Sequence, residues 1–253
     1  MFTRIKTKSE IDSMRASGQI LATILKLLEE QLSVGMTTQQ LADSAGRELK
    51  ALGGKPAFLG YFGYPDVLCV SINDEVVHGI PSSRRVIEDG DIVSIDFGVL
   101  YEGMITDSAL TTIAGRPKSA TDTKLVQDTR KSLNAGIGAL HGGVMVGDVA
   151  AAIQKVLDDG KYGVVRDLVG HGVGHELHED PNIPNYGSRG MGPKLEVGMT
   201  IAIEPMATLG DYRVYIENDG WTVRTRDGSR AAHFEHTVLI TENGAEILTE
   251  RRN

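Results

Sequence analysis

The residues between 91 and 111 include two aspartates that an antiparallel hairpin would bring face to face. The stretch DIVSIDFGVLYEGMITDSALT contains two apolar-rich runs separated by a YEG turn signal at 101–103, a pattern typical of a β-hairpin. If the turn centres just after Tyr101, Asp96 lies directly opposite Asp107. Opposed like charges repel, and burying them unpaired costs more still. A divalent cation between the acids is one interpretation, and a solvent-facing hairpin whose acids never meet is the other.

A second group of chemically active residues lies between 168 and 187. The stretch LVGHGVGHELHEDPNIPNYG contains His171, His175 and His178, although the whole chain has only 7 histidines. Neutral imidazole is the commonest metal ligand, and glycine lets the backbone approach a ligand closely. Taken alone, the segment could equally be a surface loop that binds nothing.

Two glutamates end or interrupt apolar runs in the same way as the aspartates. Glu204 follows TIAI at 200–203, and Glu235 stands within AAHFEHTVLIT at 231–241. One such acid is more often a half-exposed strand residue, but four acids with a histidine cluster form a larger donor set. That set exceeds the needs of one tetrahedral zinc ion and suits two divalent ions bridged by carboxylates. Such a centre lowers the pKa of a bound water and polarises a carbonyl, so the sequence predicts a hydrolase.

Other nucleophiles have little support in the sequence. The chain has no G-x-S-x-G or P-loop pattern, so neither a serine nucleophile nor a nucleotide reaction is indicated. The single cysteine, Cys69, lies in the apolar run VLCVSI, where a cysteine is usually a small core residue.

The composition is that of an ordinary globular chain. With 253 residues, 41% apolar and 24% charged, the chain can bury a substantial core. Its net charge of −8 argues against nucleic acid or an anionic membrane as the main partner. One cysteine excludes an internal disulfide, no run is long enough to span a membrane, and MFTRIKTKSE has no signal-peptide core. We therefore expect a cytoplasmic protein.

The elements that must position these residues begin with two helices. Apolar residues at helical spacing predict a long helix that is capped at Ser9 and ends near Gly35. A second helix, capped by Thr37, leads to short strands at 67–72 and 75–80.

The same order restarts in the second half of the chain. A long helix begins near Thr121, and a shorter one is predicted to be capped by Asp148 and ended by Gly160. The run EDGDIVSID at 88–96 parallels EVGMTIAIE at 196–204, each with a glycine six residues before its final acid. We interpret this pattern as a weak internal duplication.

The duplication predicts one domain, residues 1–253, built from two related halves of about 1–120 and 121–253. No linker or low-complexity segment separates the halves. If they pack about a pseudo-twofold axis, Asp96 and Glu204 meet at the shared centre.

The chain resembles the type I methionine aminopeptidases over nearly its full length. The resemblance rests on the following segments: GYPDVLCVSINDEVVHGIP at 63–81, SIDFG and TDSA in the hairpin, GHGVGHELHEDP at 170–181, IAIEPM at 201–206, and DGWTVRTRDGSRAAHFEHTVLIT at 219–241. It implies an α+β pita-bread fold, in which two pseudo-twofold-related halves of helices and antiparallel strands surround a central dinuclear metal site.

The resemblance also implies a ligand set for two divalent ions, whether Co, Mn, Fe or Zn. The implied ligands are Asp96, Asp107, His171, Glu204 and Glu235, with Asp107 and Glu235 bridging the ions.

Three of the matching residues take catalytic roles by the same resemblance. His78 and His178 would contact the substrate, His178 stabilising the oxyanion and His78 bonding near the scissile amide. Glu204 would pass a proton to the leaving amine.

The resemblance further implies a pocket for the methionine side chain. Its walls would be Phe58, Tyr61, Tyr64, Cys69, Leu177 and Trp221, and aromatic rings with a soft sulfur suit a thioether. The chain departs from the family pattern at Phe62, where a polar residue is common, and at Leu177, where an aromatic residue is common. Only 25 residues separate His178 from Glu204, too few for the long insertion of the type II enzymes.

We expect the remaining histidines to support the fold or the ligands rather than to bind metal or substrate. They are His141, His175, His233 and His236, of which His236 is the best placed to support a ligand.

The expected activity is metal-dependent removal of the N-terminal methionine from nascent or newly made polypeptides whose second residue is small. The expected partners are thus peptide substrates and transiently the ribosome, without nucleic acid or membrane, and the protein is expected to be a monomer. One alternative is an X-prolyl aminopeptidase, although those enzymes carry a large N-terminal domain and the first helix here is expected by residue 9. The others are a hydrolase of another small amide and a catalytically silent pita-bread binding protein, although such proteins typically lose ligands.

Overall fold

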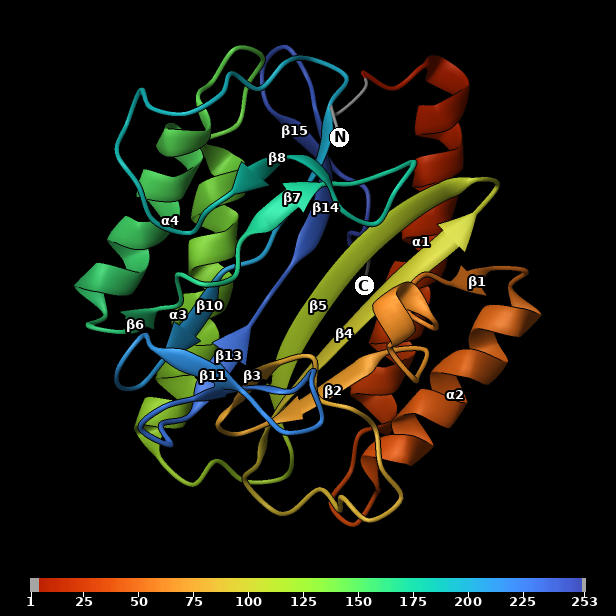
Figure 1. The fold of residues 1–253 in the computed structure, drawn as a ribbon, viewed down its shortest axis with the longest axis vertical. Coiled ribbons are helices and arrows are strands. Elements are labelled where there is room, and N and C mark those ends of the chain that lie inside the picture. The colour runs from red at the N-terminus through yellow and green to blue at the C-terminus, as the bar shows by residue number, and fades with distance from the viewer. Residues whose placement is uncertain (1–4, 252–253) are drawn as a thin grey trace.

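A long antiparallel hairpin runs through the middle of the molecule (Figure 1). The computed structural model describes residues 5–251, so the first four residues of the stretch searched for a signal peptide lie outside it. The hairpin consists of β4 (Ile92–Tyr101) and β5 (Met104–Ile113). Helices α1 (Lys8–Gln31) and α2 (Thr38–Ala51) lie on one side of it, and α3 (Ala120–Gly138) and α4 (Val146–Asp159) lie on the other. The predicted helix–helix–strand order is thus present twice.

Every strand pairing among the described residues is antiparallel. One sheet has the order β1 (Lys55–Pro56), β4, β2 (Cys69–Ile72), with β5 paired to β4, and a second has β11 (Val214–Ile216), β12 (Val223–Thr225), β3 (Glu75–Val77). A third has β13 (Ala231–His233), β10 (Met206–Thr208), β6 (Gly163–Val164). The fourth has β15 (Ala245–Ile247), β14 (His236–Ile240), β9 (Thr200–Ile203), β7 (Gly170–Gly172), β8 (Glu179–Ile183). A short 3₁₀ turn, η1 (Tyr61–Gly63), precedes β2.

The register of the central hairpin differs from the prediction. Asp107 pairs with Gly98 rather than with Asp96, because the turn centres one residue later than expected. Glu102 and Gly103 form a two-residue turn with φ of 48° and 80°, and positive φ at both positions is what a type I′ hairpin turn requires. Since Gly98 and Asp96 are two residues apart on one strand, both acids still lie on the same face of the sheet, as diagonal neighbours.

The first helix is capped two residues before the predicted cap, Ser9, and ends before the predicted stop. Its N-cap is Thr7, whose hydroxyl accepts a hydrogen bond from the backbone N–H of Glu10 at 3.4 Å, while the Glu10 carboxylate accepts from the Thr7 N–H at 2.7 Å. This is a full capping box, whereas Ser9 is followed three residues later by Asp12 instead of the Glu or Gln that such a box requires. The helix ends at Gln31 rather than near Gly35.

The caps of the shorter helices agree in part with the prediction. Thr37 forms the predicted box with Gln40 at the start of α2, and Gly160 follows the last residue of α4 as expected. Asp148, however, is the third residue of α4 rather than its cap, and its carboxylate accepts from the backbone N–H of Met145.

The main hydrophobic core is continuous between the two halves. It includes Leu25 of α1, Leu41 of α2 and Ile95 of β4 together with Leu133 of α3 and Ile203 of β9. Because these buried side chains form one contiguous cluster, residues from both halves share a single core.

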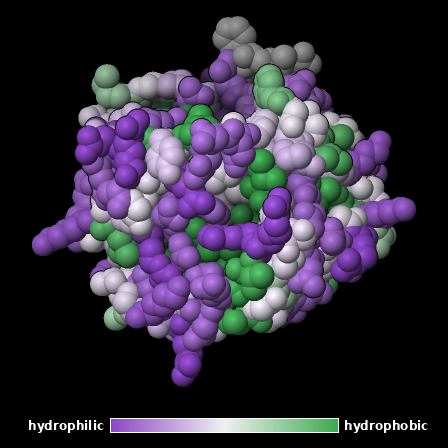
Figure 2. Space-filling view, turned by 60° about the horizontal axis from the view of Figure 1, so that its bottom comes forward, coloured by the Kyte–Doolittle hydropathy of each residue, from purple (hydrophilic) through white to green (hydrophobic). Residues whose placement is uncertain are grey.

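The face of the molecule shown in Figure 2 is largely polar. On the face shown in Figure 2, hydrophilic side chains predominate and hydrophobic ones gather mainly in a narrow central strip. Among the described residues, the structure has no helix that is both long and apolar enough to pass through a bilayer.

Candidate active site

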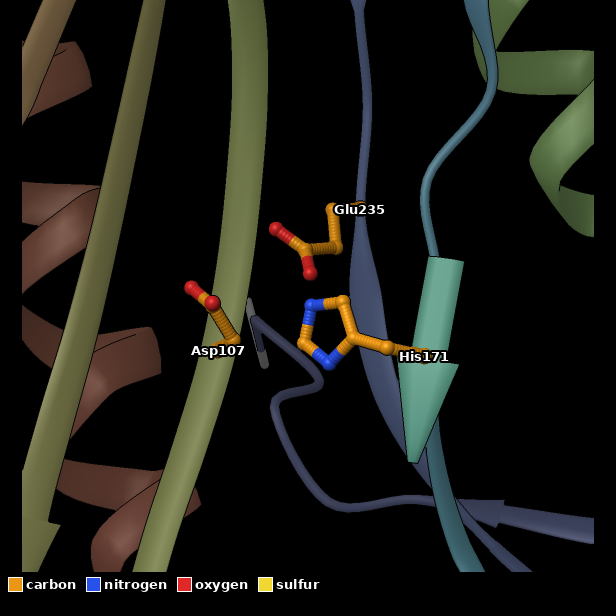
Figure 3. Close-up of side chains that lie close together, drawn as sticks. All are labelled: Asp107, His171 and Glu235. Atoms are coloured by element: carbon orange, nitrogen blue, oxygen red, sulfur yellow. The ribbon is translucent and has the colours of Figure 1, made fainter. Parts of the chain in front are cut away.

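A cluster of buried donor atoms lies where the central hairpin faces β7 and the segment before β14. Asp107 of β5, His171 of β7 and Glu235 each offer one donor atom, and these atoms all lie within 4.8 Å of one another. Figure 3 shows the three side chains pointing toward a common centre from separate parts of the chain. The sequence separates these residues by up to 128 positions, so only the fold brings them together.

Backbone hydrogen bonds hold the second-half residues onto the hairpin. The N–H of Glu235 donates to the carbonyl of Ala109 at 3.0 Å, and the N–H of Ala109 donates back at 3.3 Å. The hydroxyl of Thr237 accepts from the N–H of Asp107 at 2.9 Å and donates to its carbonyl at 2.8 Å. Asp107 and Glu235 are therefore fixed relative to each other through their main chains.

The ring of His171 has a defined orientation. Its Nδ1 lies 2.9 Å from the carbonyl oxygen of Gly172, which can only accept, so Nδ1 carries the proton. The other ring nitrogen, Nε2, keeps its lone pair and lies 3.6 Å from Oε1 of Glu204. Burial, with His178 nearby, lowers the pKa of His171 to about 3, so the ring is neutral at pH 7. A neutral imidazole fixed through its other nitrogen is the usual form of a metal-binding histidine.

Burial, together with mutual repulsion, opposes ionisation of the carboxyl groups in the cluster. Burial and then the charges of Asp107 and Glu204 raise the pKa of Asp96 far above its ordinary value. Burial raises the pKa of Asp107 to about 8, with a further contribution from Glu204. Burial and then Asp107, Glu204 and Asp96 raise that of Glu235 as well. One or more positive charges would relieve this repulsion.

Two buried carboxylate oxygens without hydrogen-bond partners indicate whether a metal ion fits the site. Oδ1 of Asp96 and Oδ1 of Asp107 are buried and have no hydrogen-bond partner in the structure. Buried carboxylate oxygens without donors are rare, because their desolvation is uncompensated. Hard oxygen atoms with one neutral imidazole are the donors that divalent ions accept, so the residues present fit a metal centre.

A single pocket contains every residue that the sequence predicted for metal, substrate or catalysis. Its lining is Phe58, Tyr61, Tyr64, Cys69, His78, Asp96, Asp107, His171, Leu177, His178, Glu204, Trp221 and Glu235. The pocket thus combines carboxylates and histidines with apolar and aromatic side chains.

The apolar part of the lining is a packed cluster of its own. Phe58, Tyr64, Cys69 and Leu177 are buried against one another, and Trp221 packs on them partly exposed. The Trp221 ring meets the Tyr64 ring edge to face at 5.1 Å. Burial and the nearby Asp96 raise the pKa of the Cys69 thiol well above its usual value, so this cysteine is a neutral wall residue and not a nucleophile.

The two histidines that the sequence predicts to contact the substrate are held differently. His178 has its Nδ1 2.7 Å from the hydroxyl of Tyr61, and its ring lies 4.3 Å from that of His171. His78 adopts a φ of 60°, a strained left-handed conformation that is uncommon for a residue with a Cβ and is often kept for function. Burial lowers the pKa of His78 to about 4, so its ring is neutral at pH 7.

Of the histidines expected to play supporting roles, His233 rather than His236 lies near Glu204. His236 bonds to the hydroxyl of Thr249, whereas His233 lies with Nε2 3.6 Å from Oε2 of Glu204. Both nitrogens of His233 are buried without a hydrogen-bond partner. Its position two residues before Glu235, on the same side of an extended chain, is the signal that could have identified it.

Comparison with known proteins agrees with the metal-binding geometry of the site. Residues 12–242 match metallopeptidase family M24. The chain belongs to this family. As an M24 member it is 46% identical over 245 residues to a methionine aminopeptidase of Clostridium acetobutylicum, covering 97% of this chain and 98% of the relative.

Solved structures confirm the fold of this M24 member. It is similar to the crystal structure of a methionine aminopeptidase from Thermotoga maritima, with a TM-score of 0.97 and 48% identity, covering 98% of this chain and 100% of that one. A prolidase from Pyrococcus furiosus matches with a TM-score of 0.78 and 27% identity, covering 98% of this chain but 66% of the prolidase. The predicted α+β pita-bread architecture is therefore confirmed.

Proposed function

We propose that this chain is a metal-dependent aminopeptidase that removes the N-terminal methionine from newly made polypeptides whose second residue is small. The observation that carries the proposal is the pocket, in which an acidic cluster suited to divalent metal meets an apolar cleft that includes Cys69. An unbranched thioether fits such a cleft. Full-length relatives that are 42–46% identical and are named methionine aminopeptidases support the same activity.

The metal ligands in this proposal are Asp96, Asp107, His171, Glu204 and Glu235. They would hold two divalent ions, of Co, Mn, Fe or Zn, with Asp107 and Glu235 shared between the ions. When bound, the ions supply Lewis acidity that polarises the scissile carbonyl and lowers the pKa of water.

The chain's own residues orient the substrate and move the proton. His178, with Nδ1 engaged by Tyr61, has Nε2 available to the carbonyl oxygen of the first residue. The neutral ring of His78 lies in the same pocket and is assigned to the scissile amide. Glu204, whose oxygens lie 3.6 Å from His171 Nε2 and from His233 Nε2, is assigned the transfer of a proton to the leaving amine.

We also propose that residues 1–253 form one catalytic domain of two related halves that works as a monomer. The pocket supports this division, because its lining from Phe58 to Asp107 belongs to the first half and its lining from His171 to Glu235 belongs to the second. Both halves are needed for one site, and that site is complete within one chain. Transient contact with the ribosome, where nascent chains emerge, belongs to the same proposal.

The test is mass spectrometry of a Met-Ala-Ser peptide and an Ala-Pro peptide, each incubated with chelator-stripped protein, with and without added divalent metal. We expect loss of the leading methionine alone, and only with metal. Cleavage before proline would instead favour an activity like that of the prolidase relative, and cleavage of neither peptide with any metal would favour a binding protein.

A further inference from the structure

A buried ion pair joins the segment before α1 to the part of the pocket that carries His178. We call residues 174–179 the histidine loop. Nζ of Lys6 donates to Oε2 of Glu179 at 2.7 Å, and the two side chains are 0% and 3% exposed. Buried charges are costly unless they are paired and hydrogen-bonded, so a fully buried lysine and glutamate next to a pocket call for a reason beyond stability.

The second oxygen of Glu179 closes the histidine loop on itself. Oε1 accepts from the backbone N–H of His175 at 2.7 Å and from that of Glu176 at 3.2 Å. The carboxylate therefore bridges the two ends of a tight turn, and the residues between them include Leu177 and His178. Both of these residues line the pocket.

The side chain of Lys6 reaches Glu179 through a gap that only glycine leaves open. Gly174 has a φ of 151°, and a Cβ at this position would lie 2.4 Å from Cε of Lys6 and 3.2 Å from Cε of Met104. The carbonyl of Gly174 accepts from the N–H of Ile105 on β5 at 2.7 Å. The loop is thus tied at one end to the hairpin that bears Asp107 and at the other end to Lys6.

We propose that Glu179, whose buried charge is paired with Lys6, is a positioning residue that sets the place of His178 and Leu177 in the pocket. Neither side chain of the pair lines the pocket, so each acts only through the loop. The proposal rests on the proposed function for its activity readout.

Two double variants separate positioning from stability. Lys6→Met/Glu179→Gln removes both charges but keeps an amide oxygen that can accept from the His175 and Glu176 N–H groups. Lys6→Met/Glu179→Met removes the charges and that acceptor together. Replacing both partners avoids the uncompensated buried charge that a single variant would leave and that could prevent folding.

We expect the glutamine variant to keep kcat within about threefold of the parent, because an amide oxygen still accepts, although more weakly than a carboxylate. We expect the methionine variant to lose kcat by about 10- to 100-fold, since displacement of a catalytic group by about 1 Å has effects of that size. Metal content should stay equal in both variants, because the ligands lie outside residues 174–179. Lys155→Met/Asp159→Met, at an exposed pair on α4, is the control for the loss of an ion pair.

Amide hydrogen exchange of the metal-free protein provides a readout that does not depend on activity. Residues 175 and 176 should exchange faster in the methionine variant than in the glutamine variant, with the core of α3 unchanged in both. Equal exchange and equal kcat in the two variants would overturn the proposal. If the parent fails to cleave the methionine peptide, the proposed function fails, and the exchange measurement still decides the role of Glu179.

Discussion

The central hairpin and the histidine loop support the same pocket by different means. The hairpin that carries Asp96 and Asp107 is held by an unbroken ladder from Ile92↔Ile113 to Tyr101↔Met104. The histidine loop follows a strand whose register shifts between Gly170 and Gly172, and long-range side-chain contacts and single backbone bonds hold it in place. Many hydrogen bonds together fix the conformation of a strand ladder, whereas the conformation of the histidine loop depends on a few contacts. Metal binding should therefore tolerate distant changes that catalysis does not.

The largest effect should come from removing a carboxylate of the cluster. Asp96→Ala or Glu235→Ala should abolish metal loading and turnover together, as seen by elemental analysis and peptide cleavage. Because the buried carboxyls repel one another, the metal-free Asp96→Ala protein should also melt at a higher temperature than the metal-free parent. Full activity in Asp96→Ala would contradict the ligand assignment.

Removing a histidine proposed to contact the substrate should give the next largest effect and should separate turnover from metal binding. His78→Ala should lower kcat by about 100-fold, the usual size for loss of a positioned proton donor or acceptor. Metal content should be unchanged, since His78 is not among the five proposed ligands. Parallel loss of metal would place His78 among the ligands instead.

A glycine substitution tests the loop directly. Gly174→Ala should lower the free energy of unfolding by about 1–3 kcal/mol, because its φ of 151° and the contact with buried Lys6 leave no room for a Cβ. Turnover should fall with it. Gly46→Ala, in α2 with nothing within 4 Å of the added Cβ, is the matched control and should raise stability by up to about 1 kcal/mol. Equal stabilities in denaturant unfolding would argue against a tightly held loop.

The smallest effect should be a pH dependence of stability that arises from the contact between Glu10 and His175 of the histidine loop. The hydrogen bond from His175, with those from Thr7, lowers the pKa of Glu10 from 4.5 to about 2. A carboxyl whose pKa is lower in the folded state stabilises the fold above pH 4.5, and this contribution is lost as the pH falls toward 2. The Glu10 side chain is partly exposed, so screening reduces its contribution to about 0.5–1 kcal/mol.

Comparison with Glu10→Gln isolates this contribution. The two proteins should differ in urea unfolding at pH 7 and should converge between pH 4.5 and 2. A difference that stayed constant over that range would mean that the Glu10 carboxylate has no special role.

Much of the fold could be predicted from the sequence, because its signals are local. The capping box at Thr37, the glycine that ends α4 and the two apolar runs of the hairpin depend on neighbours within a few positions. Where local signals competed, the prediction was wrong by small shifts. The first helix is capped by Thr7 rather than Ser9, and the hairpin turn centres one residue later than expected.

By itself, the sequence determined which residue types could do chemistry and, through the resemblance, which of them to group. Only the tertiary structure decided what supports them. It showed that His233 rather than His236 approaches Glu204, and that Lys6 reaches Glu179 across 173 positions. The reason is physical, because long-range packing decides which buried groups form an ion pair and which are left without a partner. Residues far apart in sequence show no periodic pattern from which their contact could be predicted.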